Sequence, residues 1–204
     1  LATKYLEGEV LTDEELLSGL KTGIKNGAIT PVFMGSSQID STATEFMDSI
    51  ISFFPNPLDE TDIKAVKPGT NESIEIKHDS SSLAALIFKT SADPFVGKLS
   101  YIKIYSGNLK SDSTIWNANA KESERIGQVY SMRGQTQENV DQISVGDIGT
   151  LTKLSSALTG HTLTTKDANI ELTGIGFPNP VYNMSMKPKT QADLDKMTSS
   201  IARI

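Results

Sequence analysis

The chain has 204 residues, of which 37% are apolar and 22% are charged. This composition excludes a disordered or collagen-like protein, and no apolar run reaches the roughly 18 residues of a membrane span. The absence of cysteine excludes disulfides, zinc fingers and thiol nucleophiles.

The net charge of −6 is spread unevenly along the chain. Residues 1–82 carry 14 acidic and 6 basic side chains, residues 83–174 carry 9 of each, and residues 175–204 carry 2 and 4. Such a balance argues against coating nucleic acid through bulk charge, but it leaves room for a local contact from the neutral middle or the basic end. The chain begins at Leu1 without an initiator methionine, so we expect a piece of a longer protein.

The first predicted elements are a helix and a strand. Thr12 and Glu15 have the spacing of a capping box that opens a helix, and Asn26-Gly27 ends it. The apolar run at residues 28–34 favours a strand buried on both faces, as in a parallel sheet.

A glycine-containing loop follows this strand. Gly35-Ser36-Ser37 lies where open α/β sheets bind ligands, at the carboxyl end of a strand, and its backbone N–H groups could contact a ligand. The alternative is a plain turn from strand to helix. Thr42 and Glu45 predict a second capping box, opening a helix that Pro55-Asn56-Pro57 stops.

The middle of the chain reads as a linker followed by a β-barrel. Residues 60–82 are polar and predict a linker with one short strand at residues 74–76. Short strands separated by Gly and Asp turns then predict a closed antiparallel barrel over residues 83–174. The predicted strands are residues 83–89, 98–105, 113–117, 124–130, 148–154 and 162–165.

The last segment, residues 175–204, starts a further unit. Tyr182, Met184 and Met186 alternate with polar residues and predict a half-buried strand. Thr190 and Asp193 open a helix. Because this single strand has two open edges, we expect it to seek an outside partner.

Few side chains suggest chemistry by themselves. His78 and His161 lie in polar loops without companions at metal-ligand spacing, and we expect both to be solvated. Trp116 is expected in the core or at the barrel rim. The loop at residues 93–98 has an apolar centre, with Phe95 either exposed as a contact surface or packed into the barrel mouth.

With these pieces in order, the chain resembles bacterial elongation factor G, the ribosomal translocase. The motifs that carry the resemblance are Tyr5-Leu6-Glu7-Gly8-Glu9, Met34-Gly35-Ser36-Ser37, Asp93-Pro94-Phe95-Val96-Gly97-Lys98-Leu99, Tyr105-Ser106-Gly107, Glu124-Arg125-Ile126-Gly127, Gly146-Asp147-Ile148, Gly160-His161-Thr162-Leu163, Phe177-Pro178-Asn179-Pro180 and Lys187-Pro188-Lys189-Thr190. His161 replaces the family's acidic residue, and Ser37 stands where alanine is usual.

The resemblance implies a mixed α and β fold. An antiparallel β-barrel of the translation-factor domain II type, residues 83–174, would be flanked by an α/β remnant of a GTPase domain, residues 1–59, and the β-α start of a third domain, residues 175–204. Residues 60–82 would be the linker.

The resemblance also implies a function, which is GTP-driven translocation on the ribosome in the cytoplasm. The parent protein would bind GTP or GDP with Mg²⁺, whereas this fragment lacks the phosphate loop and is expected to be no enzyme by itself and to hold no cofactor. Its implied partners are small-subunit rRNA and the missing segments of the G domain and domains III–V, with no membrane. Gly35, Ser36 and Ser37 would contact guanine. The implied ribosome contacts are Asp93, Phe95, Val96, Lys98, Arg125 and Arg133.

Three alternatives stay open at this point. The chain could be a stand-alone β-barrel binding module, an enzyme with a site between its segments, or part of a ribosomal protection or release-type GTPase. A phosphate-binding loop in the gene upstream of residue 1 would decide most of this.

Overall fold

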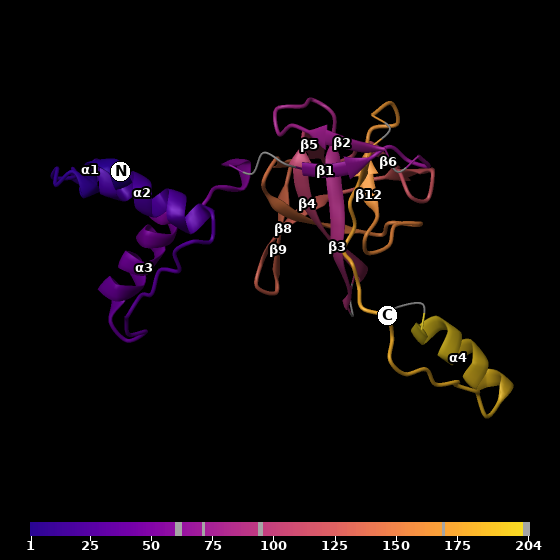
Figure 1. The fold of residues 1–204 in the computed structure, drawn as a ribbon. Coiled ribbons are helices and arrows are strands. Elements are labelled where there is room, and N and C mark those ends of the chain that lie inside the picture. The colour runs from indigo at the N-terminus through magenta and orange to yellow at the C-terminus, as the bar shows by residue number, and fades with distance from the viewer. Residues whose placement is uncertain (60–62, 71, 94–95, 169, 202–204) are drawn as a thin grey trace. The chain divides into compact units, whose positions relative to one another are not determined.

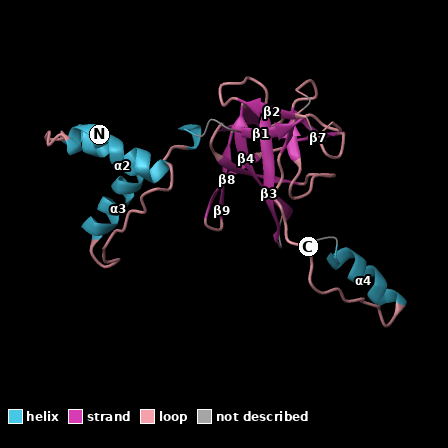
Figure 2. Ribbon diagram, in the orientation of Figure 1, coloured by secondary structure: helices cyan, strands magenta, loops and turns pink. Residues whose placement is uncertain are grey.

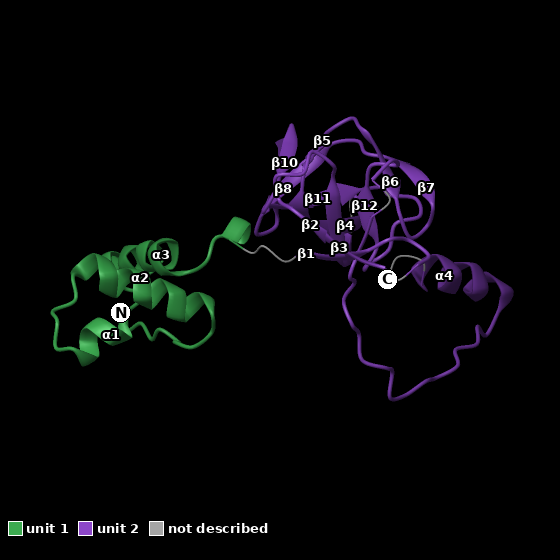
Figure 3. Cartoon of the chain, turned by 45° about the horizontal axis from the view of Figure 1, so that its top comes forward, with its two compact units in different colours: residues 1–60 green, residues 61–204 purple. Residues whose placement is uncertain are grey.

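A computed structural model describes residues 1–59, 63–70, 72–93, 96–168 and 170–201 (Figure 1). The chain divides into two compact units, residues 1–60 and 61–204, which we call unit 1 and unit 2 (Figure 3). The finer assignment of residues 83–174 as one domain and 175–204 as the start of another stays a prediction. None of the described helices is long and apolar enough to cross a membrane.

Unit 1 is helical in its described part (Figure 2). Its elements are α1 (Ala2–Leu6), α2 (Asp13–Lys25), α3 (Asp40–Phe53) and the short 3₁₀ helix η1 (Pro57–Asp59). The capping box at the start of α2 is confirmed, because Glu15 N donates to Thr12 Oγ1 and Thr12 N donates to Glu15 Oε2. The predicted end is confirmed too, with Asn26 as the C-cap.

Two predictions in unit 1 are wrong. Residues 28–34 form no strand, and their side chains are largely exposed, Val32 by 86% and Met34 by 96%. A strand needs a neighbour to pair its backbone groups, and unit 1 contains no other strand among its described residues. The capping box at Thr42 is also absent, because α3 already begins at Asp40 and places Thr42 inside its first turn.

The described part of unit 2 contains three antiparallel sheets. An eight-stranded sheet has the order β7-β6-β12-β3-β4-β11-β8-β9, a three-stranded sheet the order β13-β1-β2, and β10 pairs with β5. The strand bounds are β1 Ile63–Val66, β2 Ser73–Ile76, β3 Ala84–Asp93, β4 Gly97–Ser106, β5 Asn108–Lys110, β6 Thr114–Asn117, β7 Glu122–Arg125, β8 Val129–Arg133, β9 Thr136–Val140, β10 Gln142–Ser144, β11 Ile148–Thr152, β12 Thr162–Thr164 and β13 Glu171–Leu172.

The antiparallel barrel predicted from the sequence is confirmed as the fold class of unit 2, and its core explains the strand patterns. Alternate residues of β4, Ile102 and Ile104, point inward and meet Leu151 and Leu163 in the main core. A second core lies between the three-stranded sheet and the outer side of β3, where Ala84 and Leu86 are buried. The first half of β3 is therefore covered on both faces, which is why its sequence is continuously apolar.

The sequence-based strand list needs three corrections. The predicted strand at residues 124–130 divides into β7 and β8. The predicted linker contains a hairpin, β1 and β2, rather than one strand, and Ile63 pairs with Ile76 across it. The prediction missed polar strands such as β9, whose single apolar residue, Val140, gives no period-2 signal.

The C-terminal segment contains a helix but no strand among its described residues. Residues 181–187, predicted as a half-buried strand, are irregular, and Tyr182 and Met184 are 75% and 82% exposed. The alternation was misleading because a strand is stable only beside a partner. The helix α4 (Gln191–Ile201) does begin as predicted, since Asp193 N donates to Thr190 Oγ1 and Thr190 N donates to Asp193 Oδ2.

Candidate functional site

The Gly35-Ser36-Ser37 loop is an exposed turn held by a threonine of α3. Ser36 N donates to Thr42 Oγ1 at 3.1 Å, and the Thr42 hydroxyl lies 2.7 Å from Ser36 O and 2.8 Å from Ile39 O. The Ser36 amide is therefore engaged within the loop. The Gly35 and Ser37 amides have no acceptor in the part of the chain that the structure describes, so they are the donors that this loop offers to an outside group.

The turn between β3 and β4 is organised by Asp93. Asp93 ends β3, and its Oδ1 accepts a hydrogen bond from Val96 N at 3.0 Å. Gly97, with a φ of 81°, is the first residue of β4. Asp93 therefore shapes the turn. Phe95, the predicted contact at its tip, lies outside the described residues.

A short loop at residues 155–157 is held by hydrogen bonds to side chains of two strands, β4 and β7. Lys98 of β4 donates from Nζ to Ala157 O at 2.5 Å. Glu124 of β7, only 3% exposed, accepts hydrogen bonds from Ser155 N at 3.0 Å and from Ser156 N at 2.7 Å. The Ser156 hydroxyl adds a third at 2.8 Å. Lys98 and Glu124 thus fix this loop. The Lys98 ammonium group is engaged by a hydrogen bond within the protein.

The Glu124 carboxylate is ionised at neutral pH. Burial by itself raises the pKa of Glu124, but the hydrogen bonds from Ser155, Ser156 and Ala157 outweigh burial and lower it below the usual 4.5. Hydrogen bonding to the charged form favours that form. A buried negative charge thus anchors the 155–157 loop.

The two predicted arginine contacts differ in their surroundings. Arg125 follows Glu124 on β7 and is exposed, with no carboxylate partner among the described residues. Arg133 ends β8 and is also exposed, but its Nη2 lies 2.7 Å from Glu138 Oε1 on β9. The positive charge of Arg125 is therefore more available to an outside group than that of Arg133.

The strand register separates Arg133 from Lys98. On β11, Ile148 pairs with Lys103, Thr152 pairs with Leu99, and Thr150 pairs with Tyr130. β8 therefore runs toward the Lys103 end of the sheet, so Arg133 and Lys98 lie at opposite ends. Among the predicted contacts, Asp93 and Val96 meet directly in the β3–β4 turn. Lys98 bonds the same 155–157 loop as Glu124, the residue before Arg125.

Neither histidine is the solvated side chain predicted from the sequence. His78 is half-buried with Nδ1 2.8 Å from Tyr105 O, and His161 is half-buried with Nδ1 3.2 Å from the amide nitrogen Nδ2 of Asn117. The described residues contain no cluster of side chains suited to a metal ion. Trp116 is half-buried in β6 beneath Lys166 Nζ, 5.3 Å from the ring centroid, which fits the rim alternative.

We predict that protonation of His161 weakens the barrel. Burial, and then the positive charge of Lys98, lower the pKa of His161 below 6.5, while Glu171 opposes them. A histidine whose folded-state pKa is lowered binds its proton more readily when unfolded, so stability is complete above pH 6.5 and falls as the pH drops below it. Urea unfolding of the wild type and of His161→Gln at several pH values measures this. The wild type should lose stability relative to the variant on acidification, and a constant difference would refute the prediction.

The comparisons with known proteins agree with the fold of unit 2. The family model "Elongation factor G domain 2" matches residues 82–166. A crystal structure of a protein from Thermus thermophilus superposes with a TM-score of 0.71 at 21% sequence identity. The superposition covers 98% of this chain and 28% of that chain, so the present sequence spans less than a third of its length.

The antiparallel sheets of unit 2 thus have the fold of domain 2 of elongation factor G. Through residues 82–166 the chain is similar to domain 2 of elongation factor G, as the sequence motifs predicted.

Proposed function

We propose that this chain is the ribosome-docking part of an elongation-factor-G-like translational GTPase. The observation that carries the proposal is the match of residues 82–166 to domain 2 of elongation factor G. The parent protein would work in the cytoplasm, hydrolyse GTP with Mg²⁺ on the ribosome and drive movement of tRNA and mRNA. In this proposal the barrel contacts small-subunit rRNA.

Arg125 is the side chain best placed for such an rRNA contact. An exposed arginine without a carboxylate partner in the described chain can offer its planar fork of N–H donors to a phosphate. Lys98 and Asp93 instead shape the neighbouring loop and turn, so their removal would act through that structure. Arg133 would first have to leave Glu138.

In this proposal the backbone amide of Ser37 makes the guanine contact. The Ser36 amide is already bonded to Thr42 Oγ1, whereas the Ser37 amide has no acceptor among the described residues. A backbone donor does not depend on the side chain, so serine in place of alanine at this position keeps the contact.

We predict that the chain alone neither hydrolyses GTP nor binds it tightly. Phosphoryl transfer needs a phosphate cradle, Mg²⁺ ligands and a positioned water, and one base-contacting loop supplies none of them. Calorimetry with GTP and Mg²⁺ should show no binding in the low micromolar range. Low-micromolar affinity would overturn the assignment of residues 1–59.

The docking proposal is tested by cosedimentation with isolated ribosomal subunits. We expect the chain to bind small subunits in preference to large ones, and Arg125→Glu to weaken that binding and reduce the slope of log K against log salt by about one. Lys196→Glu on α4 makes the same charge change away from the barrel strands and should bind as the wild type does. Binding to large subunits alone, or equal weakening by the two variants, would contradict the proposal.

A further inference from the structure

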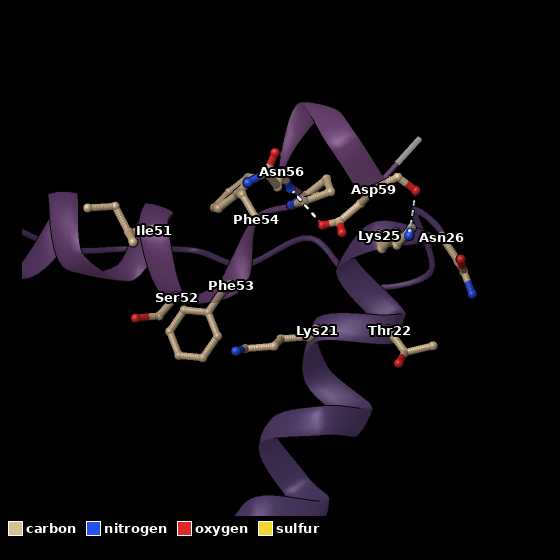
Figure 4. A pocket seen from close by; sticks show the side chains of 11 residues that line it. Lys21, Thr22, Lys25, Asn26, Ile51, Ser52, Phe53, Phe54, Asn56 and Asp59 are labelled. Carbon is tan, nitrogen blue, oxygen red and sulfur yellow. Dashed lines mark hydrogen bonds between the residues drawn. The ribbon is translucent and has the colours of Figure 1, made fainter. Parts of the chain in front are cut away.

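A cavity of about 550 Å³ lies between the C-terminal ends of α2 and α3 (Figure 4). Lys21 and Lys25 of α2 line it on one side, and Phe53 and Phe54 line it on the other. Figure 4 shows the Lys21 side chain extending toward Phe53. Nothing in the proposed function of the barrel uses this cavity.

Two of the three lysines of unit 1 lie at this cavity. Residues 1–60 contain ten acidic residues, three lysines and no arginine or histidine. Lys4 is ion-paired with Glu15 at 2.6 Å. The other two lysines, Lys21 and Lys25, line the cavity. Within the described residues, neither Lys21 nor Lys25 pairs with a carboxylate.

The acidic residue in the cavity wall does not neutralise these lysines. Lys25 Nζ donates to the main-chain oxygen of Asp59 at 2.9 Å. The Asp59 carboxylate instead accepts a hydrogen bond from Asn56 N at 2.8 Å, which caps the turn of η1. The two ammonium groups therefore retain unused donors.

An apolar wall stands opposite the lysines. Phe53 is half-buried, Phe54 is 43% exposed and Ile51 is 79% exposed. Exposed aromatic and aliphatic surface beside charged donors suits a ligand with an acidic group and a neighbouring apolar group.

We propose that this cavity binds an acidic peptide segment of a partner protein. One carboxylate contacts Lys21 and Lys25, and an adjacent leucine or phenylalanine side chain packs against Phe53 and Phe54. A nucleic acid fits less well, because its run of phosphates would meet the excess of carboxylates on unit 1 along its length, whereas a short peptide brings its carboxylate to the two lysines alone.

The test uses the full chain, isotopically labelled, and the peptide acetyl-Glu-Leu-Phe-Glu-amide in an NMR titration. We expect shifts of the amides of Lys21, Thr22 and Lys25 with a dissociation constant of about 1 mM or tighter. The peptide with both glutamates replaced by glutamine should bind at least fivefold more weakly. Lys21→Ala should have the same effect, and Lys21 is exposed, so its replacement leaves the fold intact.

Lys4→Ala is the matched control, since it removes the third lysine of unit 1 without touching the cavity, and it should bind as the wild type does. The proposal is wrong if millimolar peptide shifts none of these amides, or if the glutamine peptide binds equally well. A single-stranded oligouridylate that shifts the same amides more strongly than the peptide would also overturn it. These outcomes are independent of ribosome binding.

Discussion

Glu124→Ala is expected to destabilise the barrel by about 3 kcal/mol, since hydrogen bonds to a charged group contribute about 1.5–3 kcal/mol and the buried donors lose their acceptor. Glu124 accepts three hydrogen bonds from Ser155 and Ser156 and is 3% exposed. Trp116, the single tryptophan, lies on the neighbouring strand β6 and reports unfolding in urea by its fluorescence.

Glu122→Ala is the matched control for this variant. Glu122 begins the same strand, β7, but is exposed, and substitutions of that kind stay within about 0.5 kcal/mol. Equal losses for the two variants would mean that the 155–157 loop does not depend on Glu124.

The same carboxylate predicts how the barrel responds to acid. The folded-state pKa of Glu124 is lowered below 4.5, so its contribution to stability is present above pH 4.5 and is lost as the pH falls through the lowered value. The stability difference between the wild type and Glu124→Ala should therefore shrink below pH 4.5.

Gly107→Val is expected to cost about 3 kcal/mol. Gly107 has a φ of 67°, and left-handed backbone strains an L-residue by roughly 1–2 kcal/mol. A Cβ atom there would also lie 3.0 Å from backbone atoms of Ser82 and Leu83, and overpacking adds about 1–3 kcal/mol. The measurement is again the urea midpoint of Trp116 fluorescence.

Gly107→Ala and Gly134→Ala separate these two costs. Gly134 has a φ of 61° but open space around its Cβ position, so alanine there pays for backbone strain alone. Gly107→Ala should be the more destabilising of the two. A similar loss at both positions would show that the chain at Ser82 and Leu83 moves aside freely.

Local signals in the sequence predicted local structure well. Thr12 and Thr190 open α2 and α4 with reciprocal hydrogen bonds, because a capping box needs only residues three apart. Glycine tolerates a positive φ between two strands, and Gly107, between β4 and β5, has one. The strand β4 was predictable because its inward residues recur at the strand period, and β3 because a short continuous apolar run is typical of a strand covered on both faces.

Partner-dependent structure could not be predicted in the same way. Residues 28–34 and 181–187 have strand-like patterns but no described neighbour to pair with, so they stay irregular. The role of Glu124 was missed for a related reason. Its hydrogen-bond donors lie some thirty positions further along the sequence. From the sequence alone, a glutamate next to an arginine is typical of an exposed pair of charges, and nothing local indicates the loop that buries Glu124.

The most direct test of ribosome docking is hydroxyl-radical footprinting of small-subunit RNA with the chain bound. The account predicts one compact set of protected riboses, and weaker protection of the same riboses with Arg125→Glu at equal concentration, while Lys196→Glu protects them fully. No protection at concentrations that saturate cosedimentation, or protection unchanged by Arg125→Glu, would contradict it.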